Sequence, residues 1–160
     1  MTERWAADAL PAEVSTRIAS ARVGRLATVN ARHEPRVVPI CFALLQAPGP
    51  TIVSVLDEKP KRVGDGELAR VRNLRANPAC SLVIDHYEED WSRLQFVQVN
   101  GSARVIEPGE ALHAAALDAL RTKYSQYRAM ELVHRPVIII EIASVTTWRG
   151  DGESFRTEGR

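Results

Sequence analysis

The chain has 160 residues, the length of one domain that can bury a hydrophobic core. Its 21 basic and 20 acidic residues leave a net charge of +1, which argues against a global electrostatic attraction to DNA or to acidic membranes. We therefore expect no nucleic-acid partner and no membrane partner. Any anion-binding site must come from local clustering of basic residues.

Three features of the sequence predict a cytoplasmic protein. Cys41 and Cys80 lie in apolar runs and form no metal-ligand or redox pattern, which is typical of small buried residues in a reducing compartment. The N-terminal segment is acidic and lacks the apolar run of a signal peptide. The longest apolar run, 137–142, is interrupted by Glu141 and is too short to span a bilayer.

Hydrophobic periodicity and turn residues predict three helices and six strands. The helices are expected over residues 11–21, 67–76 and 108–121. The strands are expected over residues 23–30, 35–45, 51–57, 79–85, 94–106 and 137–148. Asp65 is placed to cap the second helix, and Gly101 is placed to form a bulge in the fifth strand.

These elements do not alternate as strand–helix–strand units, so we expect a mainly β protein. The favoured architecture is a six-stranded antiparallel barrel, closed or partly closed, with peripheral helices. Residues 1–150 would form one domain, and residues 151–160 would be a loosely ordered tail.

The segment 59–75 is the most basic part of the chain. It contains six cations against two carboxylates, Asp65 and Glu67. The cations are Lys59, Lys61, Arg62, Arg70, Arg72 and Arg75. Basic side chains next to a helix N-terminus are a favourable setting for a phosphate group. Helical spacing lets Arg70 and Asn73, or Arg72 and Arg75, face one ligand, and a solvated basic surface is the alternative.

The strand over 35–45 separates bulky from small side chains. Its even positions are bulky and suit a core: Val38, Ile40, Phe42 and Leu44. Its odd positions are small: Val37, Pro39, Cys41 and Ala43. A flat ring could lie against this small face, or a helix or a partner subunit could cover it.

Other candidate residues carry weaker signals. Trp91 and Trp148 lie near strand ends, where each could stack on a ring or simply pack. The four histidines show no metal-ligand spacing, and there is no nucleophile motif, dinucleotide fingerprint or phosphate-binding loop signature. The sequence therefore predicts no catalytic side chain and no metal site.

Four segments in this order resemble the pyridoxamine-phosphate-oxidase-like, flavin-binding split-barrel family. They are RVGRLATVNARHEPRVVPICF (22–42), VSVLDEKPKR (53–62), ARVRNLRANPACSLVID (69–85) and DWSRLQFVQVNGSARVI (90–106). The RNLRANP helix followed by the DWSRL loop is most similar to the branch of oxidoreductases that use the deazaflavin coenzyme F420.

The resemblance implies a split-barrel homodimer with two cofactor sites at the subunit interface. The ring would lie near Pro39 and Cys41, with Ser54 and Val55 as a neighbouring floor, and Trp91 close by. The phosphate contacts would fall on Lys59, Lys61, Arg70 and Asn73, with Arg62 and Arg72 as further candidates. Two features depart from the family pattern: the residues around 63–67 are additional, and Pro39 stands where a polar residue is usual.

This resemblance implies a coenzyme F420-dependent oxidoreductase that transfers a hydride between the cofactor and a small organic substrate. An FMN-dependent enzyme of the same fold is one alternative. A non-catalytic protein that binds or sequesters a flavin or F420 is another, because the sequence contains no recognisable acid, base or nucleophile motif.

Overall fold

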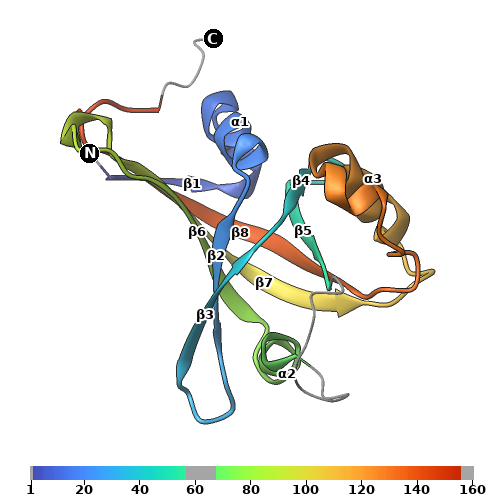
Figure 1. Cartoon of the computed structure of the whole chain (residues 1–160). Coiled ribbons are helices and arrows are strands. Elements are labelled where there is room, and N and C mark those ends of the chain that lie inside the picture. The colour runs from blue at the N-terminus through green and yellow to red at the C-terminus, as the bar shows by residue number, and fades with distance from the viewer. Residues whose placement is uncertain (1, 57–67, 156–160) are drawn as a thin grey trace.

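The computed structural model describes residues 2–56 and 68–155 (Figure 1). In these residues it contains eight antiparallel strands and three α-helices. The strands are β1 (Thr2–Ala6), β2 (Gly24–Val29), β3 (Pro35–Ile40), β4 (Ala43–Leu45), β5 (Thr51–Val55), β6 (Ala79–His86), β7 (Gln95–Ile106) and β8 (Val137–Arg149). The helices are α1 (Ala12–Ser20), α2 (Ala69–Ala76) and α3 (His113–Lys123). No helix in the described residues is long and apolar enough to cross a membrane.

The strand order shows how the sheet curls into a split barrel. Seven strands follow the path β3-β2-β6-β7-β8-β5-β4, and β1 pairs with the C-terminal part of β8. The two ends of this path, β3 and β4, are separated by only Cys41 and Phe42, so the sheet must bend back on itself. No ladder joins β3 to β4 in the described residues, so the barrel stays open along this seam. The predicted mainly β split-barrel fold is confirmed.

The strand count differs from the prediction because two features are not visible in local sequence patterns. The predicted strand over 35–45 divides at Cys41–Phe42, where the backbone leaves the ladder and the hydroxyl of Tyr124 accepts a hydrogen bond from Phe42 N at 3.0 Å. The strand β1 was not predicted, and its register with β8 pairs Thr2 with Trp148.

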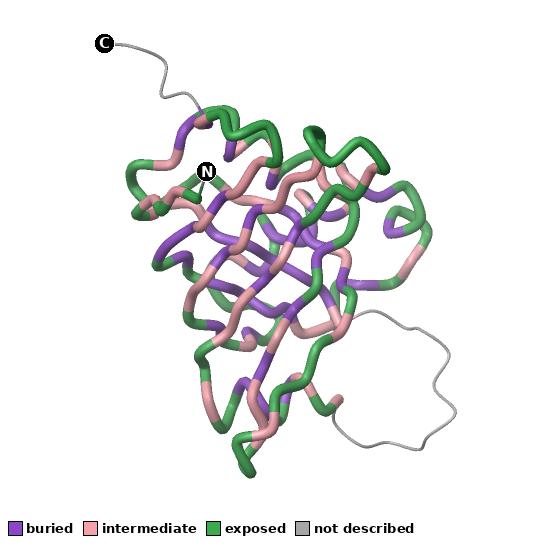
Figure 2. The backbone as a smooth tube through the Cα atoms, turned by 90° about the vertical axis from the view of Figure 1, so that its left-hand side faces the viewer, coloured by how far each residue is buried: buried purple, intermediate pink, exposed green. Residues whose placement is uncertain are grey.

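The buried positions gather on the strands in the middle of the molecule (Figure 2). Two apolar clusters make up the core. One fills the barrel and includes Leu26, Leu82 and Val99, each without exposed surface, together with Val14 and Ile18 of α1. The other lies between α3 and the strands β4, β5 and β8. It includes Ala43, Val53, Val55, Leu117, Leu120 and Tyr124. Burial on both faces of β5 follows from this two-sided packing.

Several predicted boundaries are confirmed and others are corrected. The register between β7 and β8 shifts at Asn100 and Gly101, which confirms the predicted bulge. The helix α2 has Leu68 at its N-cap position, and the expected cap, Asp65, lies outside the described residues. The helix α3 starts at His113 instead of residue 108, and the preceding Leu112 has a φ of +70°.

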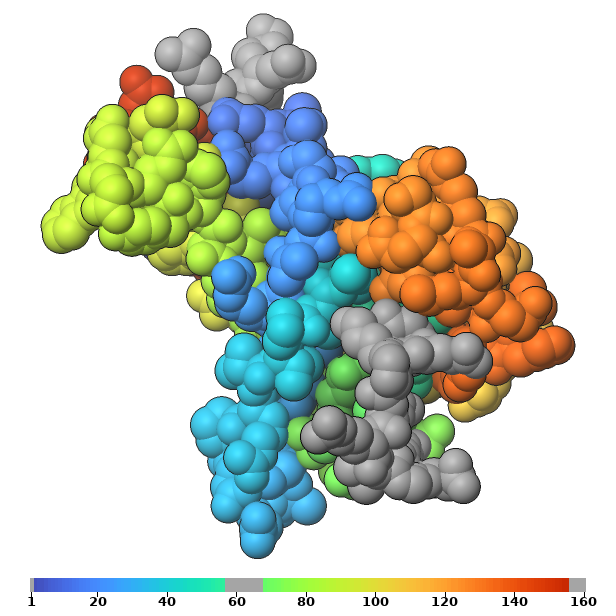
Figure 3. Space-filling view, in the orientation of Figure 1, coloured from blue at the N-terminus to red at the C-terminus, as the bar shows by residue number. Residues whose placement is uncertain are grey.

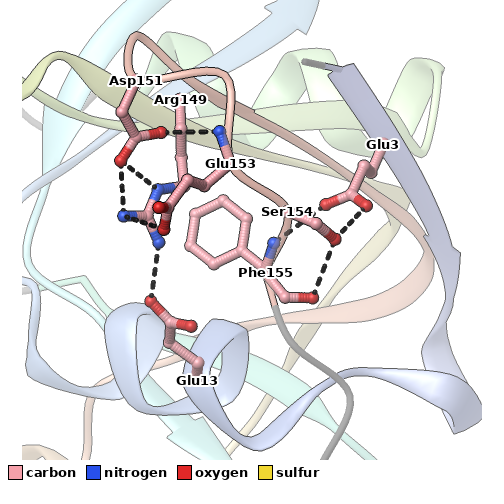
Figure 4. A network of polar contacts seen from close by, with 7 residues as sticks. All are labelled: Glu3, Glu13, Arg149, Asp151, Glu153, Ser154 and Phe155. Carbon is pink, nitrogen blue, oxygen red and sulfur yellow. Dashed lines mark hydrogen bonds and ion pairs between the residues drawn. The ribbon is translucent and has the colours of Figure 1, made fainter. Parts of the chain in front are cut away.

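The described part of the C-terminal tail packs against the barrel (Figure 4). Phe155 is only 1% exposed and belongs to the barrel core. Its backbone N–H and the hydroxyl of Ser154 donate to the carboxylate of Glu3 in β1, at 3.0 and 2.5 Å. Contacts with Glu3 of β1 and with Arg149 of β8 therefore hold the described residues 151–155, which differs from the loosely ordered tail that the sequence predicts.

Candidate functional site

An arginine-lined groove lies between the tip of the β2–β3 hairpin and α2. Its cavity has a volume of about 440 Å³. The lining residues are Asn30, Ala31, Arg32, Arg36, Ala69, Arg72, Asn73 and Ala76. The hairpin protrudes from the lower part of the molecule, with α2 beside it (Figures 1 and 3).

The spacing of α2 decides which of its side chains face the groove. Ala69, Arg72, Asn73 and Ala76 lie at positions i, i+3, i+4 and i+7, and so share one face of the helix. The alanines are short and leave room between helix and hairpin. Asn73 is 7% exposed, and its Nδ2 donates to the hydroxyl of Thr28 in β2 at 3.0 Å, which anchors α2 against the barrel.

The hairpin supplies the second wall of the groove. Arg36 has the same strand parity as Val38 and Ile40, which point towards the barrel interior. The hairpin extends past the barrel at this point, so the parity that buries Ile40 directs Arg36 into the groove. Arg32 comes from the turn, where the next residue, His33, has a φ of +63°.

One carboxylate organises the hairpin arginines. Oε2 of Glu34 accepts from Nδ2 of Asn30 at 2.7 Å, from Nη2 of Arg32 at 3.2 Å and from Nη2 of Arg36 at 2.8 Å. The hydrogen bond from Asn30 is the main reason that the pKa of Glu34 is lowered, and the charge of Arg36 adds to it. This carboxylate stays ionised at neutral pH and orients both guanidinium groups.

The electrostatics of the groove favour an anion. Arg32 and Arg36 on one wall and Arg72 on the other place guanidinium groups on both sides of the cavity, with Glu34 as the only nearby carboxylate among the described lining and hairpin-tip residues. Guanidinium groups on two walls can donate charge-assisted hydrogen bonds to one phosphate from several directions.

The structure brings together part of the predicted phosphate set. Arg72 and Asn73 line the groove, whereas Arg70 is half-buried and does not. In this groove Asn73 lies with Arg72, and the role of Arg70 in holding a phosphate stays a prediction. The candidates Lys59, Lys61 and Arg62 lie outside the described residues. The sequence patterns did not single out Arg32 and Arg36, although a charged residue at the inward parity of β3 was a visible signal.

The small face of the strand over 35–45 divides into two environments. Val37 is 62% exposed and Pro39 is also exposed, on the face of the β3 edge strand opposite to Arg36. Cys41 is half-buried and packs against the cluster under α3, where Ala43 is 3% exposed. A helix therefore covers the end of this face, and its beginning is open.

Ser54 and Val55 are both 3% exposed. The hydroxyl of Ser54 donates to the backbone carbonyl of Cys41 at 2.8 Å, which ties β5 to the seam between β3 and β4. Val55 packs in the cluster under α3. The structure thus gives these two side chains a role inside the chain and no surface for a ring.

Trp91 and Trp148 lie at the other end of the sheet from α2. Trp91 is 70% exposed in a 3-10 turn, Trp91–Arg93, that follows β6. The eight residues of β6 separate this turn from α2, a distance of about 25 Å at ~3.3 Å per residue. Trp148 stacks on Phe96 with ring centroids 5.9 Å apart, which supports the packing interpretation for this residue.

Comparison with known proteins agrees with this architecture. The sequence model of pyridoxamine 5'-phosphate oxidase matches residues 10–149. The chain belongs to the pyridoxamine 5'-phosphate oxidase family. No curated protein of significant sequence similarity was found.

Solved structures similar to this family member share its fold at low sequence identity. A conserved hypothetical protein from Mycobacterium tuberculosis is 21% identical, with a TM-score of 0.69 over 93% of this chain and 91% of the other. A heme-binding protein from Mycobacterium smegmatis is 22% identical, with a TM-score of 0.66 over 87% of this chain and 54% of the other. An FAD-binding protein from Mesorhizobium loti is 18% identical, with a TM-score of 0.61 over 93% of this chain and 98% of the other.

Two parts of this family member lie outside the matched residues and contact each other. They are β1 at the N-terminus and the segment 150–155 that follows β8 (Figure 4). Glu3 of β1 accepts hydrogen bonds from this segment, and Arg149 at the end of β8 pairs with Asp151 at 2.7 Å and with Glu13 of α1 at 3.2 Å. These contacts close one end of the barrel.

Proposed function

We propose that this member of the pyridoxamine 5'-phosphate oxidase family is an oxidoreductase that binds coenzyme F420. It would transfer a hydride between this deazaflavin and a small organic substrate. The observation that carries the proposal is the groove, which places Arg32, Arg36 and Arg72 around one cavity of about 440 Å³. The RNLRANP helix and the DWSRL loop, which resemble the deazaflavin branch of the family, support F420 over other ring cofactors.

The described residues fit the phosphate of such a cofactor. Arg36 and Arg72 approach from opposite walls, and Asn73 is held in place by Thr28. A guanidinium can donate two parallel hydrogen bonds to a phosphate, which fixes the orientation of the group as well as its position. Ala69 and Ala76 leave the space between the walls open.

When bound, a deazaflavin supplies a hydride from its C5 position, so the hard chemistry belongs to the cofactor. This chain's own residues bind and orient the ring. Arg32, Arg36 and Arg72 hold the phosphate, and the exposed strip of Val37 and Pro39 offers an apolar surface on the other face of β3. No side chain needs to move a proton in this scheme, which agrees with the absence of a recognisable acid–base motif in the sequence.

A homodimer would complete the site. Val37 and Pro39 lie on an edge strand with exposed apolar surface, and a second copy of the chain that packs on this face would bury them. Trp91 lies about 25 Å along β6 from α2, so it cannot contact a phosphate in the groove of its own chain. We therefore propose that Trp91 contributes to a cofactor site formed with the other subunit.

Titration of the purified full-length chain tests the proposal. Coenzyme F420, FMN, FAD, heme and pyridoxal phosphate are added separately, and visible absorption is recorded after desalting. Tight retention of F420 supports the proposal. Retention of FMN or FAD without F420 would replace it with the flavin-dependent alternative, for which the family and the FAD-binding structural neighbour provide support.

Variants that remove one arginine charge test the groove, with an arginine outside the groove as the control. Arg36→Gln and Arg72→Gln each remove one charge-assisted phosphate contact, worth ~1.5–3 kcal/mol, so affinity should fall about ten- to hundredfold. Arg75→Gln is the control, because Arg75 lies on the same helix and pairs with Glu107 at 3.8 Å instead of lining the groove. Unchanged cofactor affinity in both groove variants would refute the phosphate assignment.

Turnover separates an enzyme from a binding protein. The F420-loaded protein is mixed with enones, quinones and nitroaromatic compounds, and the loss of reduced cofactor is followed by absorbance. Oxidation that depends on the acceptor supports the oxidoreductase. Stoichiometric binding with no turnover across these classes favours the non-catalytic alternative.

A further inference from the structure

A second, smaller cavity opens at the end of the barrel away from the groove. Its volume is about 190 Å³. The lining residues are Arg17, His86, Ser92, Arg93, Leu94, Gln95, Arg149 and Asp151. They come from α1, the ends of β6 and β8, the start of β7 and the turn between β6 and β7. We call this cavity the barrel mouth.

Arg17 differs from the other charged residues of the barrel mouth in having a buried N–H group without an acceptor among the described residues. Its Nε is buried, and within residues 2–56 and 68–155 it has no hydrogen-bond acceptor. Its guanidinium lies 5.9 Å from the ring centroid of Phe155, so an aromatic ring covers one side. A buried guanidinium N–H without an acceptor is costly, and such a group in a folded protein calls for a ligand or an ion.

Burial lowers the pKa of Arg17, and the nearby charge of Arg149 lowers it further, whereas the Glu13 carboxylate opposes both. The Glu13 carboxylate is itself engaged by Arg149, whose Nη1 lies 3.2 Å from its Oε1. The guanidinium of Arg17 therefore has an opposite charge in its vicinity, while its buried Nε has no hydrogen-bond acceptor among the described residues.

The other charges of the barrel mouth largely pair with one another. The Asp151 carboxylate accepts from Nε and Nη2 of Arg149, at 3.2 and 2.7 Å. Nε of Arg93 lies 3.1 Å from Glu88, which also contacts His86 at 2.8 Å. Within the described part of the chain, these pairs leave the buried Nε–H of Arg17 as a donor in the cavity that still needs an acceptor.

The size and polarity of the cavity define the ligand class. A volume of about 190 Å³ is below the ~300 Å³ at which sites for drug-sized ligands begin, so a flavin or nucleotide does not fit. Gln95 adds a neutral side-chain donor beside Arg17 and Arg93, whereas the N–H and the hydroxyl of Ser92 already donate to Asp90, at 3.1 and 2.7 Å. Several donors around one small space are the requirement for an oxyanion.

We propose that the barrel mouth binds a small oxyanion, a phosphate or carboxylate group, with Arg17 as its main ligand. This site is separate from the groove, because β6 places α2 and the barrel mouth at opposite ends of the sheet. Its occupation would join α1 to the β6–β7 turn through one bound ion.

The test uses the full-length chain, with inorganic phosphate and malonate as the two probes. NMR spectra report the amide of Ser92 and the side-chain Nε–H of Arg17, so binding at the barrel mouth is distinguished from binding in the groove. Both signals should shift saturably with at least one probe, and the stronger probe identifies the source of the oxyanion. The melting temperature should rise with the same probe, because a ligand that binds only the native state stabilises it.

Three variants decide the role of Arg17. Arg17→Gln should weaken probe binding at least tenfold, and Arg17→Lys should have an intermediate effect, because it keeps the charge but loses the planar fork. Arg104→Gln, which removes an exposed arginine paired with Glu141, should leave probe affinity unchanged. Cofactor affinity should be the same in all three, which separates this proposal from the proposed function.

Two results would overturn the proposal. One is equal probe affinity in the wild type and in Arg17→Gln. The other is a Ser92 amide that does not respond to either probe at any concentration that leaves the fold intact.

Discussion

The hydroxyl of Tyr124 holds the seam of the split barrel, and its removal should destabilise the protein. Tyr124 is 1% exposed, and Phe42, at the break between β3 and β4, has no exposed surface. The Tyr124 oxygen accepts from Phe42 N at 3.0 Å. Its proton can be donated to the carbonyl of Arg22 at 2.8 Å or to that of Phe42 at 2.9 Å. One side-chain group thus replaces the missing ladder contacts at the seam.

The substitution Tyr124→Phe keeps the ring, and with it the stacking of the Arg22 guanidinium at 4.5 Å from the ring centroid. It leaves the buried N–H of Phe42 without its acceptor. A buried donor left unpaired costs about 1–3 kcal/mol. For a domain of this size, about 2 kcal/mol corresponds to a melting temperature lowered by about 4–8 °C.

Urea denaturation followed by circular dichroism measures the change in the free energy of unfolding. Tyr87→Phe is the control, because Tyr87 is 66% exposed and its hydroxyl contacts only Glu89, at 3.4 Å, among the described residues. The control should change stability by less than ~0.5 kcal/mol. If Tyr124→Phe unfolds within that same margin of the wild type, the hydroxyl does not hold the seam.

Three further predictions concern other parts of the chain. Burial lowers the pKa of Lys123 from 10.5 to about 8. Between pH 8 and pH 10.5 the folded state therefore binds fewer protons than the unfolded state. The free energy of unfolding should rise with pH in this range. After allowance for solvent screening the rise is about 1 kcal/mol, and Lys123→Met should abolish it in denaturation curves at several pH values. Gly101→Ala would collide with a backbone carbonyl oxygen of β8 and should cost at least ~2 kcal/mol in a thermal melt, whereas Gly49→Ala has open space and should be neutral. Phe155→Ala empties a core position and should cost about 3 kcal/mol by urea denaturation; a neutral result would show that the tail does not stabilise the barrel.

Local patterns were sufficient where a single segment determines its own structure. The alternation of Val38, Ile40 and Phe42 predicted the buried face of the second predicted strand, and Gly101 predicted the bulge in β7. The spacing of Val71 and Leu74 predicted the buried face of α2, and both are 3% exposed. These features depend on the periodicity of side chains and on the conformational freedom of glycine, both of which can be recognised in consecutive residues.

Pairings between distant segments could not be predicted in the same way. The strand β1 exists because it pairs with β8 about 140 residues later, and Phe155 is buried because Glu3 holds the backbone beside it. Neither segment has a strong local signal. Long-range contacts decide the structure of such segments, and no window of the sequence contains both partners.

The candidate site was likewise predictable from the sequence only in part. The sequence alone predicted one domain, a mainly β barrel whose split form the family resemblance implied, and a basic segment suited to a phosphate. The tertiary structure decided that Arg72, rather than Arg70, faces the groove, and that Arg32 and Arg36 complete it from the β2–β3 hairpin. The physical reason is that a phosphate site needs donors from several directions, and the fold brings them together from segments nearly forty residues apart along the chain.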